Sequence, residues 1–174
     1  MKRTIFAGVI CVFLLTATGL ASLDTGIIYE TSDLGAGRWQ YTYEVTNNGL
    51  TVPIEEFTVW FDYDSYANLT VETPTTPADW DQLVLQPEPV LLDDGAYDAM
   101  ATGAGITLGQ TLGDFSVSFD FTGIGEPGSQ PYDIIDPQSF QTIDSGTTII
   151  PEPSTLLLLG LGGAILRRKR KNAR

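Results

Sequence analysis

Three segments of the sequence alternate apolar and polar residues with a period of two, and this spacing predicts β-strands. Residues 39–46 place Trp, Tyr, Tyr and Val on one face and Gln, Thr, Glu and Thr on the other. Residues 57–62 and 115–122 repeat the pattern, with Phe and Val on the apolar face. A helix would scatter these apolar side chains around its surface. We therefore expect each segment to be a half-buried strand.

Weaker runs predict further strands, and clusters of Gly, Pro, Asn and Asp separate them. These runs are residues 26–30, 83–86, 106–108, 132–135 and 139–143. No stretch between residues 24 and 150 carries the 3.6-residue apolar periodicity of an amphipathic helix. Short strands joined by turns predict an all-β domain, specifically an antiparallel β-sandwich of immunoglobulin-like or jelly-roll-like type.

The charges are segregated along the chain. All 22 carboxylates lie between Asp24 and Glu152, and Arg38 is the only cation among them. The remaining Lys and Arg residues lie at the two ends. Such segregation reflects topology or partners rather than fold. We expect no nucleic-acid partner, because a phosphate backbone is bound by Lys and Arg.

The first 21 residues have the layout of a secretory signal peptide. Lys2 and Arg3 precede an uncharged, largely apolar run at residues 5–15, and small residues follow. Signal peptidase is expected to cut between Ala21 and Ser22. The alternative is an uncleaved membrane helix, but the short apolar run and the small residues favour cleavage. The single cysteine, Cys11, would leave with the peptide.

The C-terminal residues 149–174 combine a proline-rich strip, an uncharged span and a basic tail. The strip is Pro151, Glu152, Pro153 and Ser154, the span runs over 154–166, and the tail occupies 167–174. As a short transmembrane helix the span reaches only about 20 Å, against a hydrocarbon core of ~30 Å. It therefore suits transient retention in the inner membrane. The basic residues should keep the C-terminus cytoplasmic and place the acidic domain, residues 22–148, outside. They are Arg167, Arg168, Lys169, Arg170 and Lys171.

This ordered set resembles the PEP-CTERM sorting signal of Gram-negative bacteria. The resemblance implies that an exosortase, a membrane-embedded enzyme similar to cysteine transpeptidases, recognises the chain and cuts it near Pro151–Ser154. Two prolines favour an extended strip that a protease can bind. The expected destination is the cell surface or the extracellular space, in contact with extracellular polysaccharide.

The composition excludes several kinds of catalysis. The chain has no His and one Cys, so it lacks Ser-His-Asp and Cys-His nucleophiles and a cysteine-based zinc site. Paired carboxylates could still hydrolyse glycosides, but no motif selects a pair. We therefore expect an exported protein that is not an enzyme and has no cofactor.

Two binding functions remain open. Aspartates gathered in loops could bind Ca²⁺, and the candidate ligands are Asp93, Asp94 and Asp98. None of the acidic clusters has EF-hand spacing, and a solvated acidic surface explains them as well. Trp60, on the face opposite Phe57 and Phe61, and Trp80, expected in a loop between two aspartates, could stack on sugar rings. A second packed layer explains Trp60 more simply. The alternative function is therefore an adhesin module that binds carbohydrate or calcium.

Overall fold

The structure, a computed structural model, describes residues 25–72 and 77–151. All regular secondary structure in these residues is β, which confirms the predicted fold class. The strands are β1 (Thr25–Gly35), β2 (Arg38–Asn47), β3 (Glu56–Phe61), β4 (Tyr66–Val71), β5 (Trp80–Leu85), β6 (Gly95–Ala101), β7 (Thr111–Phe121), β8 (Pro131–Asp136) and β9 (Gln141–Thr147). The described residues contain no helix long and apolar enough to cross a membrane.

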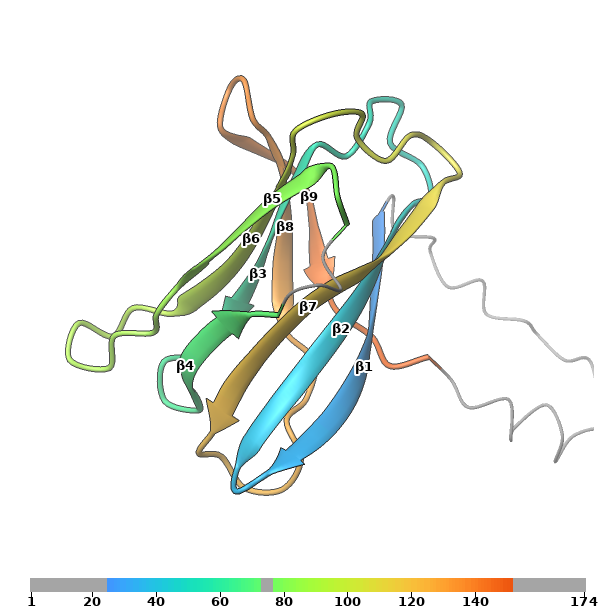
Figure 1. Ribbon diagram of the computed structural model, residues 1–174. Helices are drawn as coiled ribbons and strands as arrows, with labels where there is room; N and C mark the ends of the chain where they lie inside the picture. Colours follow the sequence, from blue (N-terminus) through green and yellow to red (C-terminus); the bar gives the residue numbers. More distant parts are fainter. Residues whose placement is uncertain (1–24, 73–76, 152–174) are drawn as a thin grey trace, which may run out of the picture.

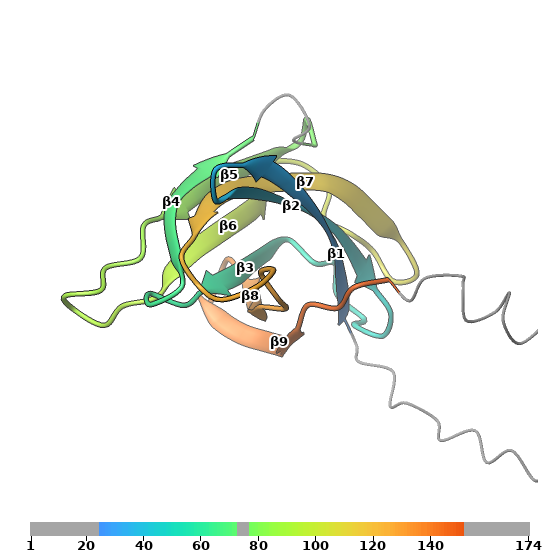
Figure 2. The same ribbon diagram turned by 90° about the horizontal axis from the view of Figure 1, so that it is seen from below.

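The strands form two antiparallel sheets that pack face to face, as Figures 1 and 2 show. The first sheet has the order β1-β2-β7-β4, and the second has the order β5-β6-β3-β8-β9. The predicted β-sandwich is therefore confirmed. The predicted signal peptide and C-terminal membrane helix lie outside the described residues.

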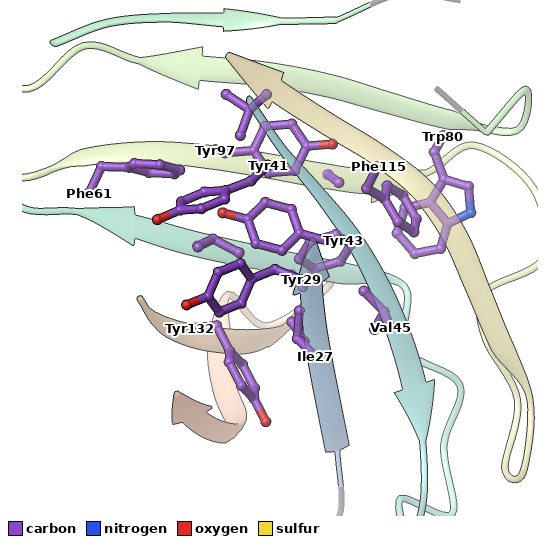
Figure 3. Close-up of a cluster of buried hydrophobic side chains, with 14 of the residues drawn as sticks. Ile27, Tyr29, Tyr41, Tyr43, Val45, Phe61, Trp80, Tyr97, Phe115 and Tyr132 are labelled. Carbon is purple, nitrogen blue, oxygen red and sulfur yellow. The ribbon is translucent and has the colours of Figure 1, made fainter. Parts of the chain in front are cut away.

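The alternating segments fill the space between the sheets. Tyr41 and Tyr43 of β2 point inward and are fully buried, while Thr42 and Glu44 face outward. Phe57 of β3 meets Phe115 of β7 edge to face across the two sheets, with ring centroids 4.9 Å apart. Each buried aromatic side chain contributes about 1.5–3 kcal/mol, and edge-to-face pairs add about 1 kcal/mol. Figure 3 shows this aromatic core.

The pairing of β4 with β7 is irregular, and Arg38 compensates for the gap. The register shifts between Ala67 and Thr70, and Asn68 lies there with a positive φ of 53°. From β2, Arg38 Nη1 donates to the Asn68 carbonyl at 2.8 Å, and Nη2 donates to Thr70 Oγ1 at 3.1 Å. The guanidinium thus satisfies polar groups on β4 where the ladder is interrupted.

The two seams between the sheets are closed in different ways. Between β4 and β5, the Gln86 side-chain amide imitates a paired peptide group. It donates to the Leu69 carbonyl at 2.7 Å and accepts from the Leu69 amide at 2.9 Å. Between β1 and β9, the chain after β9 crosses to the first sheet, where Ile149 pairs in parallel with Ile28.

The observed strands correct several sequence predictions. Residues 39–46, 57–62 and 115–122 are confirmed in β2, β3 and β7, and the weaker runs at 26–30, 83–86, 132–135 and 139–143 overlap β1, β5, β8 and β9. The predicted strand at 106–108 is wrong, because only Ile106 forms an isolated bridge, to Ile54. Strands β4 and β6 were not predicted.

Candidate functional site

The segment that leads into the predicted sorting motif is part of the folded domain. We call residues 148–150 the C-terminal strap. Thr148 is fully buried, and its amide donates to the Gln130 carbonyl at 2.8 Å. The Ile149 amide donates to the Ile27 carbonyl at 3.0 Å, and the Tyr29 amide donates to the Ile149 carbonyl at 3.0 Å. The strap is therefore a short parallel addition to the edge of the first sheet.

The start of the described chain is fixed in the same region. Thr25 is fully buried, and its carbonyl accepts a 2.8 Å hydrogen bond from the Tyr132 hydroxyl of β8. Burial, and to a smaller extent the negative charge of Asp144, raises the pKa of Tyr132 to about 12. The hydroxyl therefore stays protonated, and donates, at neutral pH.

Gln130, which directly precedes β8, connects the strap to the core. Its backbone amide donates to Thr148 Oγ1 at 2.9 Å, while Thr148 Oγ1 donates to Gln130 Oε1 at 3.3 Å. Its side-chain nitrogen donates to the hydroxyls of Tyr41 and Tyr66 at 2.8 and 3.0 Å. Burial raises the pKa of Tyr41, so its hydroxyl also remains neutral. Sequence reasoning missed Gln130 and Thr148, because no motif links residues 18 positions apart.

Both ends of the described chain consequently leave the sandwich at one edge. Ile149 runs parallel to β1, so the chain entering at Thr25 and the chain leaving after Pro151 lie along the same seam. Figures 1 and 2 agree on this: both ends leave on the side of β1 and β9, opposite the loop between β5 and β6.

The structure describes one residue of the predicted sorting motif. Pro151 is exposed and lies two positions after the last paired residue, Ile149. The other predicted processing and sorting residues lie outside the described residues, and their roles stay predictions. They are Ala21, Ser22, Glu152, Pro153, Ser154, Arg167, Arg168, Lys169, Arg170 and Lys171.

The candidate calcium ligands have different structural settings. Asp93 and Asp94 are exposed in the loop after β5, where Asp94 Oδ1 accepts from the Tyr63 amide at 3.1 Å. Asp98 was expected in a loop but lies on β6, where Thr58 Oγ1 donates to it at 2.6 Å. Burial raises the pKa of Asp98, and the negative charge of Asp81 adds to this. Among residues 25–72 and 77–151, no three acidic side chains are grouped to hold a metal ion. The calcium prediction therefore rests on the sequence alone.

The two tryptophans considered for sugar binding are placed differently. Trp60 lies on the outer face of β3, half-buried, and its Nε1 donates to Asp133 at 2.9 Å. Trp80 was expected in a loop, but it begins β5, is 6% exposed and meets Phe115 edge to face at 5.1 Å. A hollow of about 750 Å³ opens beside Trp80, and its border includes Asp79 and Asp114.

These observations define an acidic β-sandwich that, among the described residues, is paired as far as Ile149, directly before a proline-rich strip. The family model described as "PEP-CTERM protein-sorting motif" matches residues 150–171. The chain therefore carries a PEP-CTERM sorting motif, and this motif implies export, passage through a membrane-held stage and sorting by an exosortase. The match begins at the last residue of the strap. A search of curated proteins found no match.

Three solved structures share part of the strand arrangement. A cohesin module of a family 33 glycoside hydrolase from Clostridium perfringens is 10% identical, with a TM-score of 0.43, over 76% of this chain and 100% of the module. A cohesin–dockerin complex from Clostridium thermocellum gives 11% identity and a TM-score of 0.34, over 73% of this chain and 99% of the matched one. A type I cohesin from Pseudobacteroides cellulosolvens is 10% identical, with a TM-score of 0.33, over 74% of this chain and 93% of the cohesin.

Proposed function

We propose that this chain is a non-enzymatic protein of the cell surface or extracellular matrix. Signal peptidase removes residues 1–21, and the C-terminal span then holds the chain in the inner membrane. An exosortase cuts near Pro151–Ser154 and delivers the folded sandwich, which stays in contact with extracellular polysaccharide. The basic tail remains on the cytoplasmic side.

The observation that carries this proposal is the junction between domain and motif. Ile149 is hydrogen-bonded into the first sheet, and the sorting-motif match starts at residue 150. A cut at the motif therefore removes no strand of the sandwich and leaves the strap in place. The product keeps almost all the carboxylates and loses the basic tail, which favours a soluble, strongly anionic domain.

Replacement of both prolines, Pro151→Ala with Pro153→Ala, tests the proposal in the source cells. We expect the variant to accumulate in the membrane fraction, while the unchanged protein reaches the surface or the medium. The matched control is Pro137→Ala, a proline beyond β8 that is remote from the motif in sequence. Equal release of the variant and the unchanged protein would contradict sorting through this strip.

The second candidate function is carbohydrate binding at the hollow beside Trp80. Its volume falls in the range of ordinary ligand sites, and Asp79 and Asp114 could accept hydrogen bonds from sugar hydroxyls. Calorimetric titration of the protein with polysaccharides from the source cells, with and without Ca²⁺, tests this function. Heat that disappears in Asp79→Asn with Asp114→Asn would support it, and the absence of heat in the unchanged protein would remove it.

A further inference from the structure

The loop between β5 and β6 has an exposed apolar tip, residues 90–92, which could be taken for a membrane-contacting surface. Val90, Leu91 and Leu92 are 87%, 69% and 65% exposed in the loop between β5 and β6. A backbone bridge between Glu88 and Asp93 holds this tip in a defined shape, with bonds of 2.9 and 3.2 Å. Exposed aliphatic clusters of this kind often mark contact with lipid or protein.

The segment between the strap and the predicted membrane span, called the tether here, favours an orientation in which the apolar tip faces away from the membrane. Under the proposed function, the span that begins at residue 154 holds the chain in the membrane. Five residue steps separate Ile149, the last hydrogen-bonded residue that the structure describes, from Ser154. At 3.3–3.6 Å per residue, a fully extended tether reaches at most about 18 Å.

The strap and the apolar tip lie at opposite edges of the sandwich. The strap lies in the seam between β1 and β9, whereas the tip follows β5. Four strand spacings separate β5 from β9 in the second sheet, which amounts to about 19 Å. The loop projects beyond β5 on the side away from both chain ends, as Figures 1 and 2 show. If the domain stood upright on the tip, with the β5-to-β9 direction of the second sheet perpendicular to the membrane, the strap would therefore lie higher above the lipid than the tether can reach.

We propose that the membrane-held chain turns the edge formed by β1 and the C-terminal strap towards the lipid, and turns the apolar tip away from it. This inference rests on the proposed function, because it requires the C-terminal span to hold the chain. The tip would then be displayed outward before processing. Charge agrees with this arrangement, since Arg38 is the only cation in the described residues and is paired with Asp120 at 3.1 Å. No other cation in these residues competes with the tether by binding an anionic lipid surface.

Lipid-attached quenchers can test the orientation. The chain is expressed without its exosortase, so that the membrane-held form accumulates, and is reconstituted in phosphatidylcholine vesicles that contain a headgroup-nitroxide lipid. Its only cysteine, Cys11, lies in the predicted signal peptide. Single fluorophores are therefore placed through Ser32→Cys, on β1 beyond the strap, or through Val90→Cys, in the tip. Both positions are exposed.

We expect at least threefold stronger quenching at position 32 than at position 90. A matched variant with ten Gly and Ser residues inserted between Ile150 and Pro151 lengthens the tether by about 35 Å, and should bring the two values close together. Chains that float with the vesicles but quench equally at both positions, or more strongly at position 90, would overturn the orientation and leave the proposed function intact. Chains that do not float with the vesicles would overturn the membrane-held stage, and the orientation with it.

Discussion

Arg38 is expected to stabilise the first sheet more than its place at the surface indicates. Its guanidinium makes four hydrogen bonds of 2.6–3.1 Å, to Asn68, Thr70, Ser118 and Asp120. The side chain is 29% exposed, so each bond is expected to contribute about 0.5–1 kcal/mol rather than the larger values of buried charged pairs. Arg38→Met keeps the apolar stem and removes all four bonds. The predicted loss is about 2–4 kcal/mol.

Thermal and urea unfolding, followed by circular dichroism, measure this loss. For a domain of this size, the expected decrease in Tm is about 8–16 °C. Arg38→Lys should lose about half as much, because an ammonium cannot reproduce the forked geometry. The control is Gln40→Ala on the same face of β2, with an expected change below about 0.5 kcal/mol. A loss below about 0.5 kcal/mol for Arg38→Met would show that the four hydrogen bonds of Arg38 do not stabilise the sheet.

The pH dependence of the same variant gives a second check. Hydrogen bonds from Asn68, and then from Arg38, hold the pKa of Asp120 below its usual value of 3.8. A lowered pKa contributes stability above the unfolded-state value, and this stability is lost as the pH falls through the folded-state value. The difference in unfolding free energy between the unchanged protein and Arg38→Met should therefore become smaller below about pH 4. A difference that widens on acidification would contradict this assignment.

Three further predictions concern the seams and the acidic outer face. Gln86→Leu removes both hydrogen bonds to Leu69 and should lower the free energy of unfolding by about 1–2 kcal/mol. The Leu69 amide should also exchange its hydrogen faster. Unchanged exchange would show that the seam closes without Gln86. Ile149→Pro removes the amide that donates to the Ile27 carbonyl, and should lower the free energy of unfolding by about 1–2 kcal/mol. Ile150→Pro should cost much less, because the Ile150 amide makes no hydrogen bond within the described residues. Equal losses would contradict a paired strap. Burial raises the pKa of Asp98 above 3.8, so its contribution to stability is present at low pH and decreases as the pH rises through the folded-state pKa. Asp98→Asn should therefore be more stable than the unchanged protein at pH 7 and lose that advantage near pH 4, as measured by urea unfolding. A difference in unfolding free energy that stays constant with pH would argue against burial as the cause of the raised pKa.

The strands that sequence reasoning predicted are those whose alternation is uninterrupted. β4 was missed because the irregularity at Asn68 breaks the period, so that Tyr66 and Leu69 both point inward. β6 was missed because most of its buried residues are small, and Asp98 gave it the character of an acidic loop. The false strand at 106–108 carried a strand-like composition, but only Ile106 found a partner.

The candidate site divides in a similar way. The sorting motif could be predicted because its parts are adjacent in sequence and act through composition and order. Residues 145–150 could be read from the sequence as a short linker or a last strand, but the pairing of the strap could not be predicted, because it depends on Gln130, Thr148 and β1, which only the fold brings together. The positions of Trp80 and Asp98 were also mistaken, since a single residue next to aspartates carries no signal that separates a strand from a loop.

The mass of the exported product shows where the chain is processed. The protein is purified from the surface or medium of source cells and measured by intact-mass spectrometry, with C-terminal peptide mapping. We expect a chain that begins at Ser22, retains the strap through Ile150 and lacks residues 155–174. A mature protein that still contains residues 155–174 would rule out processing at the Pro151–Ser154 strip.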